Sequence, residues 1–138
     1  MTKLVPYRKD RDYSYTIGVF PTLELLAHRP ERVLRVLVSS RGEANEGMAR
    51  IRALCEARRI PVVVADRQVD RLAGSENAYV IGVFAKHEAP LDPAANHVLL
   101  VNPTDAGNLG TIARTMLGFD VTNLAIVTPA VDLLAPRS

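Results

Sequence analysis

Apolar residues recur along this chain of 138 residues in short blocks of two kinds. Consecutive apolar residues predict strands, and apolar residues spaced three and four apart predict helices. The first 85 residues or so follow the order strand or extended lead-in, helix, strand, helix, strand, helix, strand. This order is typical of an α/β sandwich. The predicted segments are 13–20, 21–29, 33–39, 42–60, 62–66, 67–74 and 78–85.

The segment 42–60 is the clearest helix, and its neighbours have recognisable ends. Pro21 stands where the first helix is expected to begin, Pro30 ends that helix, and Gly74 closes the third. The strand at 33–39 is apolar enough to be buried on both faces, and 62–66 predicts a short buried strand. The apolar face of the helix at 42–60 is expected to contain Ala44, Met48, Ile51, Leu54 and Cys55.

A second unit is predicted after the segment HEAPLDPAAN at 87–96, whose prolines and small residues indicate a linker. A strand HVLLV, a helix ending near Phe119 and a strand NLAIV follow it. This order predicts a βαβ unit with parallel strands. We therefore expect two domains, at residues 1–88 and 89–138.

The segment between those strands, NPTDAGNLGTIARTMLGF, is the candidate functional loop. Gly107 and Gly110 are expected to let the chain turn sharply. Asn108 lies about where the helix begins, so it is either a helix cap or a functional side chain. Arg114 falls off the apolar stripe and is either a solvated residue or a ligand contact. The stripe is predicted to contain Leu109, Ile112, Ala113, Met116 and Leu117.

Composition narrows the classes of function. Apolar residues make up 48% of the chain, which is enough for a core, whereas aromatic residues make up 5% and Trp is absent. The shortage of aromatic residues argues against an aromatic platform that stacks bases. Residues 1–75 contain 14 Lys or Arg against nine Asp or Glu, and residues 76–138 contain three against six. The basic half suits either a nucleic-acid backbone or an ordinary solvated surface.

The densest basic cluster is formed by Arg8, Lys9 and Arg11, which are candidate RNA contacts or part of a solvated terminal segment. The single Cys55 has no disulfide partner, and the three histidines have no spacing that suits a metal, so we expect no metal. Neither a secretion signal nor an apolar run long enough for a membrane span is apparent. We expect a cytoplasmic protein without a membrane partner.

The stretch DAGNLGTIARTMLGF resembles the first signature motif of the SpoU/TrmH-type RNA methyltransferases, whose pattern is Asp-Pro-x-Asn-x-Gly-x-x-x-Arg-Thr-Ala. Ala106 stands in the place of the usual Pro and Met116 in the place of the usual Ala. The first half of the chain is similar to ribosomal protein L30e in the stretches GVFPTLELL and YVIGVFAK. The motif positions that match are Asp105, Asn108, Gly110, Arg114 and Thr115.

This resemblance implies transfer of a methyl group from S-adenosylmethionine to a ribose 2′-hydroxyl of rRNA or tRNA by a homodimer. It implies an L30e-like three-layer α/β sandwich that binds the RNA, followed by the first βαβ part of a SPOUT domain, whose deep trefoil knot holds the methyl donor. Carried over by position, Arg114 is the catalytic arginine and Asn108 its partner, both contacting RNA. Asp105 and Gly110 would only shape the loop.

The second and third motifs of that family are expected beyond residue 138. On this interpretation the chain is an N-terminal fragment without the knot, which neither binds S-adenosylmethionine nor methylates RNA. A stand-alone L30e-like RNA-binding module without catalysis is the alternative. A Rossmann-like nucleotide-binding protein would need a complete glycine fingerprint and an acid ending its second strand, where the sequence offers only Asp132.

Overall fold

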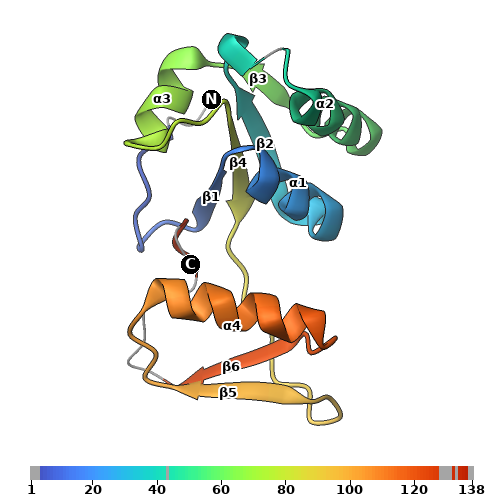
Figure 1. The fold of residues 1–138 in the computed structure, drawn as a ribbon, viewed down its shortest axis with the longest axis vertical. Coiled ribbons are helices and arrows are strands. Elements are labelled where there is room, and N and C mark those ends of the chain that lie inside the picture. The colour runs from blue at the N-terminus through green and yellow to red at the C-terminus, as the bar shows by residue number, and fades with distance from the viewer. Residues whose placement is uncertain (1–3, 43, 128–131, 133, 137–138) are drawn as a thin grey trace. The chain divides into compact units, whose positions relative to one another are not determined.

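The computed structural model describes residues 4–42, 44–127, 132 and 134–136. The chain divides into two compact units, Met1–Lys86 and His87–Ser138, which Figure 1 shows together. The division falls two residues before the boundary expected from the sequence. Within the described residues no helix has both the length and the apolar character that a membrane crossing requires.

The first unit is built on a four-stranded mixed sheet with the strand order β1-β4-β2-β3. β2 pairs in parallel with β3 and antiparallel with β4, and β4 pairs antiparallel with β1. The element order agrees with the prediction. The elements are β1 (Tyr13–Ile17), α1 (Val19–His28), β2 (Val33–Val38), α2 (Glu46–Arg58), β3 (Val62–Val64), α3 (Asp66–Ala73) and β4 (Val80–Ala85), with single 3-10 turns at Pro30–Arg32 and Ser40–Gly42.

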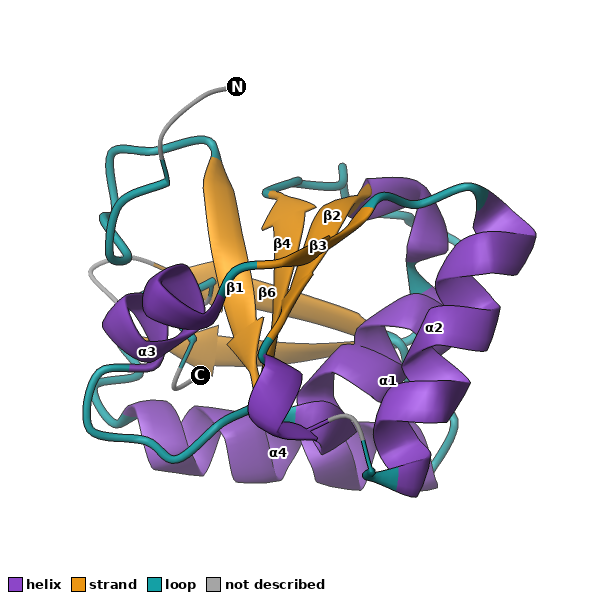
Figure 2. Ribbon diagram, turned by 90° about the horizontal axis from the view of Figure 1, so that it is seen from above, coloured by secondary structure: helices purple, strands orange, loops and turns teal. Residues whose placement is uncertain are grey.

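Helices cover both faces of this sheet, so the unit has three layers (Figure 2). On one face α1 and α2 enclose a core that includes Val36, Ile51 and Cys55. On the other face α3 and the N-terminal segment enclose a core that includes Tyr15 and Leu37. Alternate residues of β2 therefore serve the two cores, which is the period of a strand. The predicted α/β sandwich is confirmed at the level of a mixed α/β fold.

Local chemistry sets the ends of α2. The side chain of Asn45 accepts a hydrogen bond from the Gly47 amide and caps the helix, and Arg59 ends it in the left-handed region with φ 57°. Because the cap is Asn45, Ala44 lies before the helix and is exposed, so its predicted place on the apolar face is wrong. Met48, Ile51 and Cys55 are buried as predicted, and Leu54 is half-buried.

Three further expectations about the first unit are wrong in detail. α1 begins at Val19, two residues before Pro21, because the chain turns at Gly18 with φ 102°. β2 is buried on both faces from Val36 to Val38, as predicted, but not at its start: its pairing with β4 shifts between positions 33 and 35, and Leu34 at the shift is 51% exposed. β3 has three residues and lies at the edge of the sheet, which leaves Val64 exposed.

The second unit has two parallel strands joined by one helix, as predicted. β5 (His97–Val101) pairs with β6 (Asn123–Val127), and α4 (Ala106–Gly118) connects them. The linker 87–96 contains no helix or strand. Val98 shares a groove with side chains of α4, so residues 98 and 100 face the helix and their neighbours face the other way. On that other side Leu99, Val101 and Val127 are exposed apolar side chains.

Candidate functional site

Asp105 is the residue that starts α4. Its backbone is extended, with φ −114° and ψ 116°, and its Oδ1 accepts a hydrogen bond from the Asn108 amide at 2.8 Å. The first intrahelical bond runs from the Leu109 amide to the Asp105 carbonyl at 3.1 Å. Asp105 is therefore the N-cap. Asn108 is the third residue of the helix, so the interpretation of Asn108 as the cap is wrong and its exposed side chain is available to a ligand.

The sharp change of direction after β5 occurs at Asn102 and not at the glycines. Asn102 has φ 52°, and its amide donates to the Val127 carbonyl at 3.0 Å. Gly107 and Gly110 both lie within α4 and have no positive φ, so the expectation that they form the turn is wrong. Gly107 instead leaves room for the cap, because a Cβ there would lie 3.2 Å from Oδ1 of Asp105.

Arg114 is exposed, off the buried side of α4, as predicted. Among the described residues its guanidinium has no hydrogen bond or ion pair. Asn108 precedes it by six residues, which places the two about 9 Å apart along the axis and about 120° apart around it. The two side chains therefore do not contact each other, and a ligand held by both would have to extend along the helix.

The buried side of α4 is narrower than predicted. Leu109 and Met116 are buried, and positions 112 and 113 are half-buried. Leu117 is 66% exposed, and Phe119 just beyond the helix is 79% exposed. The prediction for Leu117 is wrong because two strands under one helix cover only part of its circumference. Much of the apolar surface at the end of α4 remains in contact with solvent.

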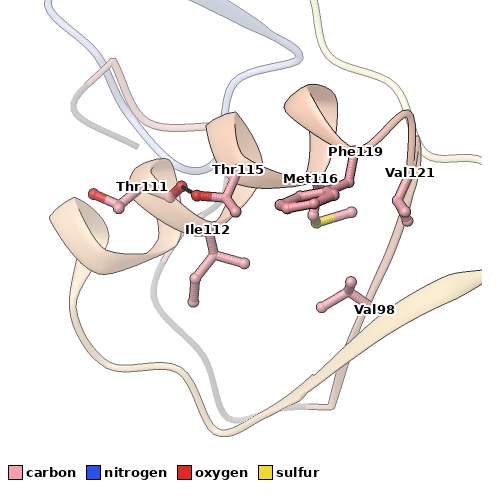
Figure 3. A pocket seen from close by; sticks show the side chains of 7 residues that line it. All are labelled: Val98, Thr111, Ile112, Thr115, Met116, Phe119 and Val121. Atoms are coloured by element: carbon pink, nitrogen blue, oxygen red, sulfur yellow. Dashed lines mark hydrogen bonds between the residues drawn. The ribbon is translucent and has the colours of Figure 1, made fainter.

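An apolar groove of about 290 Å³ lies between α4 and β5 (Figure 3). The hydroxyls of Thr111 and Thr115 donate to the carbonyls four residues earlier, at 3.0 Å each, so neither has a hydrogen to offer to a ligand. The lining is almost wholly apolar, which makes the groove unsuitable for a phosphate. Its lining residues are Val98, Thr111, Ile112, Thr115, Met116, Phe119 and Val121.

The groove also fails as a site for S-adenosylmethionine. That donor has a carboxylate, an ammonium group and a sulfonium, and charged groups need charged or polar partners when they leave water. The apolar lining supplies none of these partners. The groove therefore does not fit the donor. The residues that the structure describes bring together no group of three or more His, Cys, Asp or Glu side chains that could hold a metal ion.

The basic cluster predicted near the N-terminus belongs to the first unit. Arg8, Lys9 and Arg11 are all exposed. Arg8 forms a two-pronged ion pair with Asp10, with both nitrogen–oxygen distances at 3.1 Å. Lys9 and Arg11 have no side-chain partner among the described residues, so they are the more available cations of the three.

Sequence reasoning missed a polar cluster where β2 and β3 end. The Asp66 carboxylate accepts from the Ser40 hydroxyl at 2.5 Å and from the Ser40 amide at 2.9 Å, and Arg41 pairs with Asp70. The Ser40 hydroxyl, then the Ser40 amide, and more weakly Arg41 hold the pKa of Asp66 below its ordinary value. Because the carboxyl ends of parallel strands meet at one edge of a sheet, the position of Asp66 directly after β3 was the available signal.

Neither a protein-family model nor a curated protein matches this sequence. Solved structures do. The SpoU methyltransferase AviRb from Streptomyces viridochromogenes, in complex with AdoMet, is 20% identical, with a TM-score of 0.69 over 91% of this chain and 49% of that one. An rRNA methyltransferase from Sinorhizobium meliloti is 19% identical, with a TM-score of 0.68 over 94% and 50%.

A structure described as an RNA 2′-O ribose methyltransferase is 20% identical, with a TM-score of 0.65 over 94% of this chain and 50% of that one. The chain thus spans about half the length of each of these three structures. Identities this low establish a common fold. This chain therefore shares the mixed α/β fold of solved SpoU-type RNA methyltransferases over about half of their length.

Proposed function

We propose that this chain is the RNA-docking and arginine-bearing part of an S-adenosylmethionine-dependent methyltransferase that modifies a ribose 2′-hydroxyl of rRNA or tRNA. One observation carries the proposal. The residues that match the SpoU/TrmH motif cap α4 or lie on it, in a chain whose fold matches SpoU structures. Arg114 is exposed there without a competing acid among the described residues.

The chemistry of Arg114 limits its role. A guanidinium stays protonated throughout ordinary pH, so it does not accept the proton of the ribose hydroxyl. It can bind an RNA phosphate through two parallel hydrogen bonds and stabilise negative charge as it develops on the 2′-oxygen. Asn108, one and two-thirds turns earlier, offers an amide that can hold the ribose or the adjacent phosphate.

The donor would be held by the remaining part of a longer protein, in the trefoil knot that the resemblance implies. Support comes from the half-length coverage of the matched structures and from the apolar groove, which does not fit the donor. The same resemblance supports a homodimer as the working form. The first unit would act as the L30e-like RNA-binding domain, and its two enclosed cores make it a self-contained unit.

That self-contained first unit also supports the alternative of an RNA-binding module without catalysis. The two functions are separated by incubating the full-length protein with methyl-labelled S-adenosylmethionine and either rRNA or tRNA, then digesting the RNA to nucleosides. Label in a 2′-O-methylated nucleoside from one of the RNAs is expected. RNA binding without any label in either RNA would contradict the enzyme and favour the module.

A further inference from the structure

Lys86 fastens the N-terminal segment to the first unit. It follows β4 directly, and its amide donates to the Asp12 carbonyl at 2.9 Å. Its ammonium donates to the Tyr7 hydroxyl at 2.9 Å and to the Lys9 carbonyl at 3.2 Å, and lies 4.6 Å from the centre of the Tyr7 ring. One side chain thus holds two points of the segment through two hydrogen bonds and a cation–π contact.

The other end of the same segment is held by the core. Leu4 is 2% exposed and belongs to the core beneath α3. The Tyr15 hydroxyl donates to the Val5 carbonyl, and the Val5 amide donates to the Tyr13 hydroxyl at 3.5 Å. Residues 4–12, which we call the N-terminal strap, are therefore anchored at both ends. They do not form a free tail of the kind that basic terminal residues usually make.

The strap presents an excess of positive charge to solvent on an ordered turn, with three exposed cations against the exposed carboxylates of Asp10 and Asp12. The Arg11 amide donates to the Arg8 carbonyl at 3.2 Å, which closes the turn. Asp10 engages Arg8, whereas Lys9 and Arg11 are exposed and have no side-chain partner within the described part of the chain. Because the backbone that carries these two cations is already ordered, less backbone conformational entropy is lost when they bind phosphate.

We propose that the N-terminal strap is a docking surface for the phosphate backbone of RNA, with Lys9 and Arg11 as the contacts and Lys86 and Tyr7 as positioning residues. The proposal rests on the RNA-directed function proposed above. The backbone is the favoured target because the strap has no fully exposed aromatic ring for a base, since Tyr7 is half-buried and the Lys86 ammonium lies over its ring. The strap would therefore add affinity without sequence preference.

The contacts are tested by the salt dependence of binding between the 138-residue chain and a fluorescein-labelled single-stranded RNA of mixed sequence. Loss of two phosphate contacts lowers the slope of log K against log salt by about 1.4. The variant Lys9→Ala/Arg11→Ala is expected to show that loss and to bind about tenfold more weakly at 0.1 M salt. Arg50→Ala/Arg52→Ala removes the same charge from exposed positions of α2, which covers the opposite face of the sheet.

The positioning role is tested by Tyr7→Ala. This variant changes no charge, but it removes the hydroxyl and the ring that the Lys86 ammonium contacts. Trypsin should cleave after Lys9 and Arg11 several-fold faster, and the salt slope should fall although every cation remains.

Equal slopes for the strap and α2 double variants would overturn the docking surface. An unchanged slope in Tyr7→Ala would overturn the positioning role. If the wild-type chain binds no RNA and the full-length protein transfers no methyl group, the underlying function itself fails.

Discussion

Asp105 and Asn108 are joined by a hydrogen bond of 2.8 Å from the Asn108 amide to the Asp105 carboxylate. This bond assigns the two residues different tasks. Asp105 satisfies a backbone donor at the start of α4, and its negative charge lies at the positive end of the helix dipole. The Asn108 side chain has no part in the cap and is exposed about one and two-thirds turns before Arg114.

The first prediction concerns that cap. Asp105→Ala should destabilise the second unit by about 1 kcal/mol, because the amide of residue 108 loses its acceptor. Asp105→Ser should retain most of the stability, and Asn108→Ala should change it by less than about 0.5 kcal/mol. Urea unfolding followed by circular dichroism measures all three. A larger loss in Asn108→Ala than in Asp105→Ala would contradict the assignment of the cap.

The second prediction concerns the contact between α1 and α2. A Cβ built on Gly47 would lie 2.4 Å from Cγ1 of Val19, so Gly47→Ala forces the two helices apart. The cost of overpacking, about 1–3 kcal/mol, should exceed the gain of up to about 1 kcal/mol in helix propensity. Val19→Ala in the same chain removes the obstacle and should restore part of the loss, giving a coupling energy of about 1 kcal/mol in a double-mutant cycle. Additive effects would show that the helices do not approach this closely.

A third prediction follows from the lowered pKa of Asp66. A carboxyl whose pKa is lower in the folded state stabilises the fold above its unfolded pKa, and this contribution disappears as pH falls through the folded value. The difference in melting temperature between the wild type and Asp66→Asn should therefore be constant near neutral pH and shrink below about pH 4. Ser40→Ala should lower the melting temperature and reduce that pH dependence, because Ser40 is the main cause of the shift. A difference that grows on acidification would contradict the assignment.

The exposed side of the β5–β6 sheet gives a fourth prediction. Leu99 is 61% and Val101 is 68% exposed. Both lie on β5, on the face of the sheet that α4 does not cover. Apolar patches and open strand edges of this kind promote association. Sedimentation velocity should show concentration-dependent self-association of the chain, which Leu99→Lys should reduce. The matched change Leu91→Lys, at a 70% exposed position in the linker, should have less effect.

The sequence predicted the order and type of the α-helices and strands in the described part of the chain, because each apolar block has either the period of a strand or that of a helix. The exception is the first segment, for which the sequence allows either a strand or an extended lead-in. The errors of the prediction lie at positions where packing within the folded unit determines burial or backbone conformation. Leu34 and Leu117 have apolar side chains at positions that their units leave uncovered, and periodicity does not report how much of an element is covered. The turn at Asn102 was missed because the two glycines a few residues later are the stronger signal for a left-handed backbone, although asparagine is among the other residues that adopt it most often.

The motif proposes Asn108 and Arg114 as site residues, and their role stays a prediction. Both are exposed, as a ligand contact requires, but the geometry of the helix start could not be predicted from the sequence. Which of two polar residues caps a helix depends on the position of its first intrahelical bond, which sequence fixes only to within a residue or two. Lys86 contacts Tyr7 and Lys9, which precede it by 79 and 77 residues, and no local sequence pattern predicts such long-range contacts.

The most direct measurement is the rate of 2′-O-methyl transfer by the full-length protein with Arg114→Lys, compared with Arg50→Lys at an exposed position of α2. One ammonium does not reproduce the two parallel bonds of a guanidinium, so the rate in Arg114→Lys should fall by about 100-fold or more while Arg50→Lys remains active. The melting temperature should be unchanged in both, since neither guanidinium has a hydrogen bond or ion pair with any residue that the structure describes. A wild-type rate in Arg114→Lys would contradict the account.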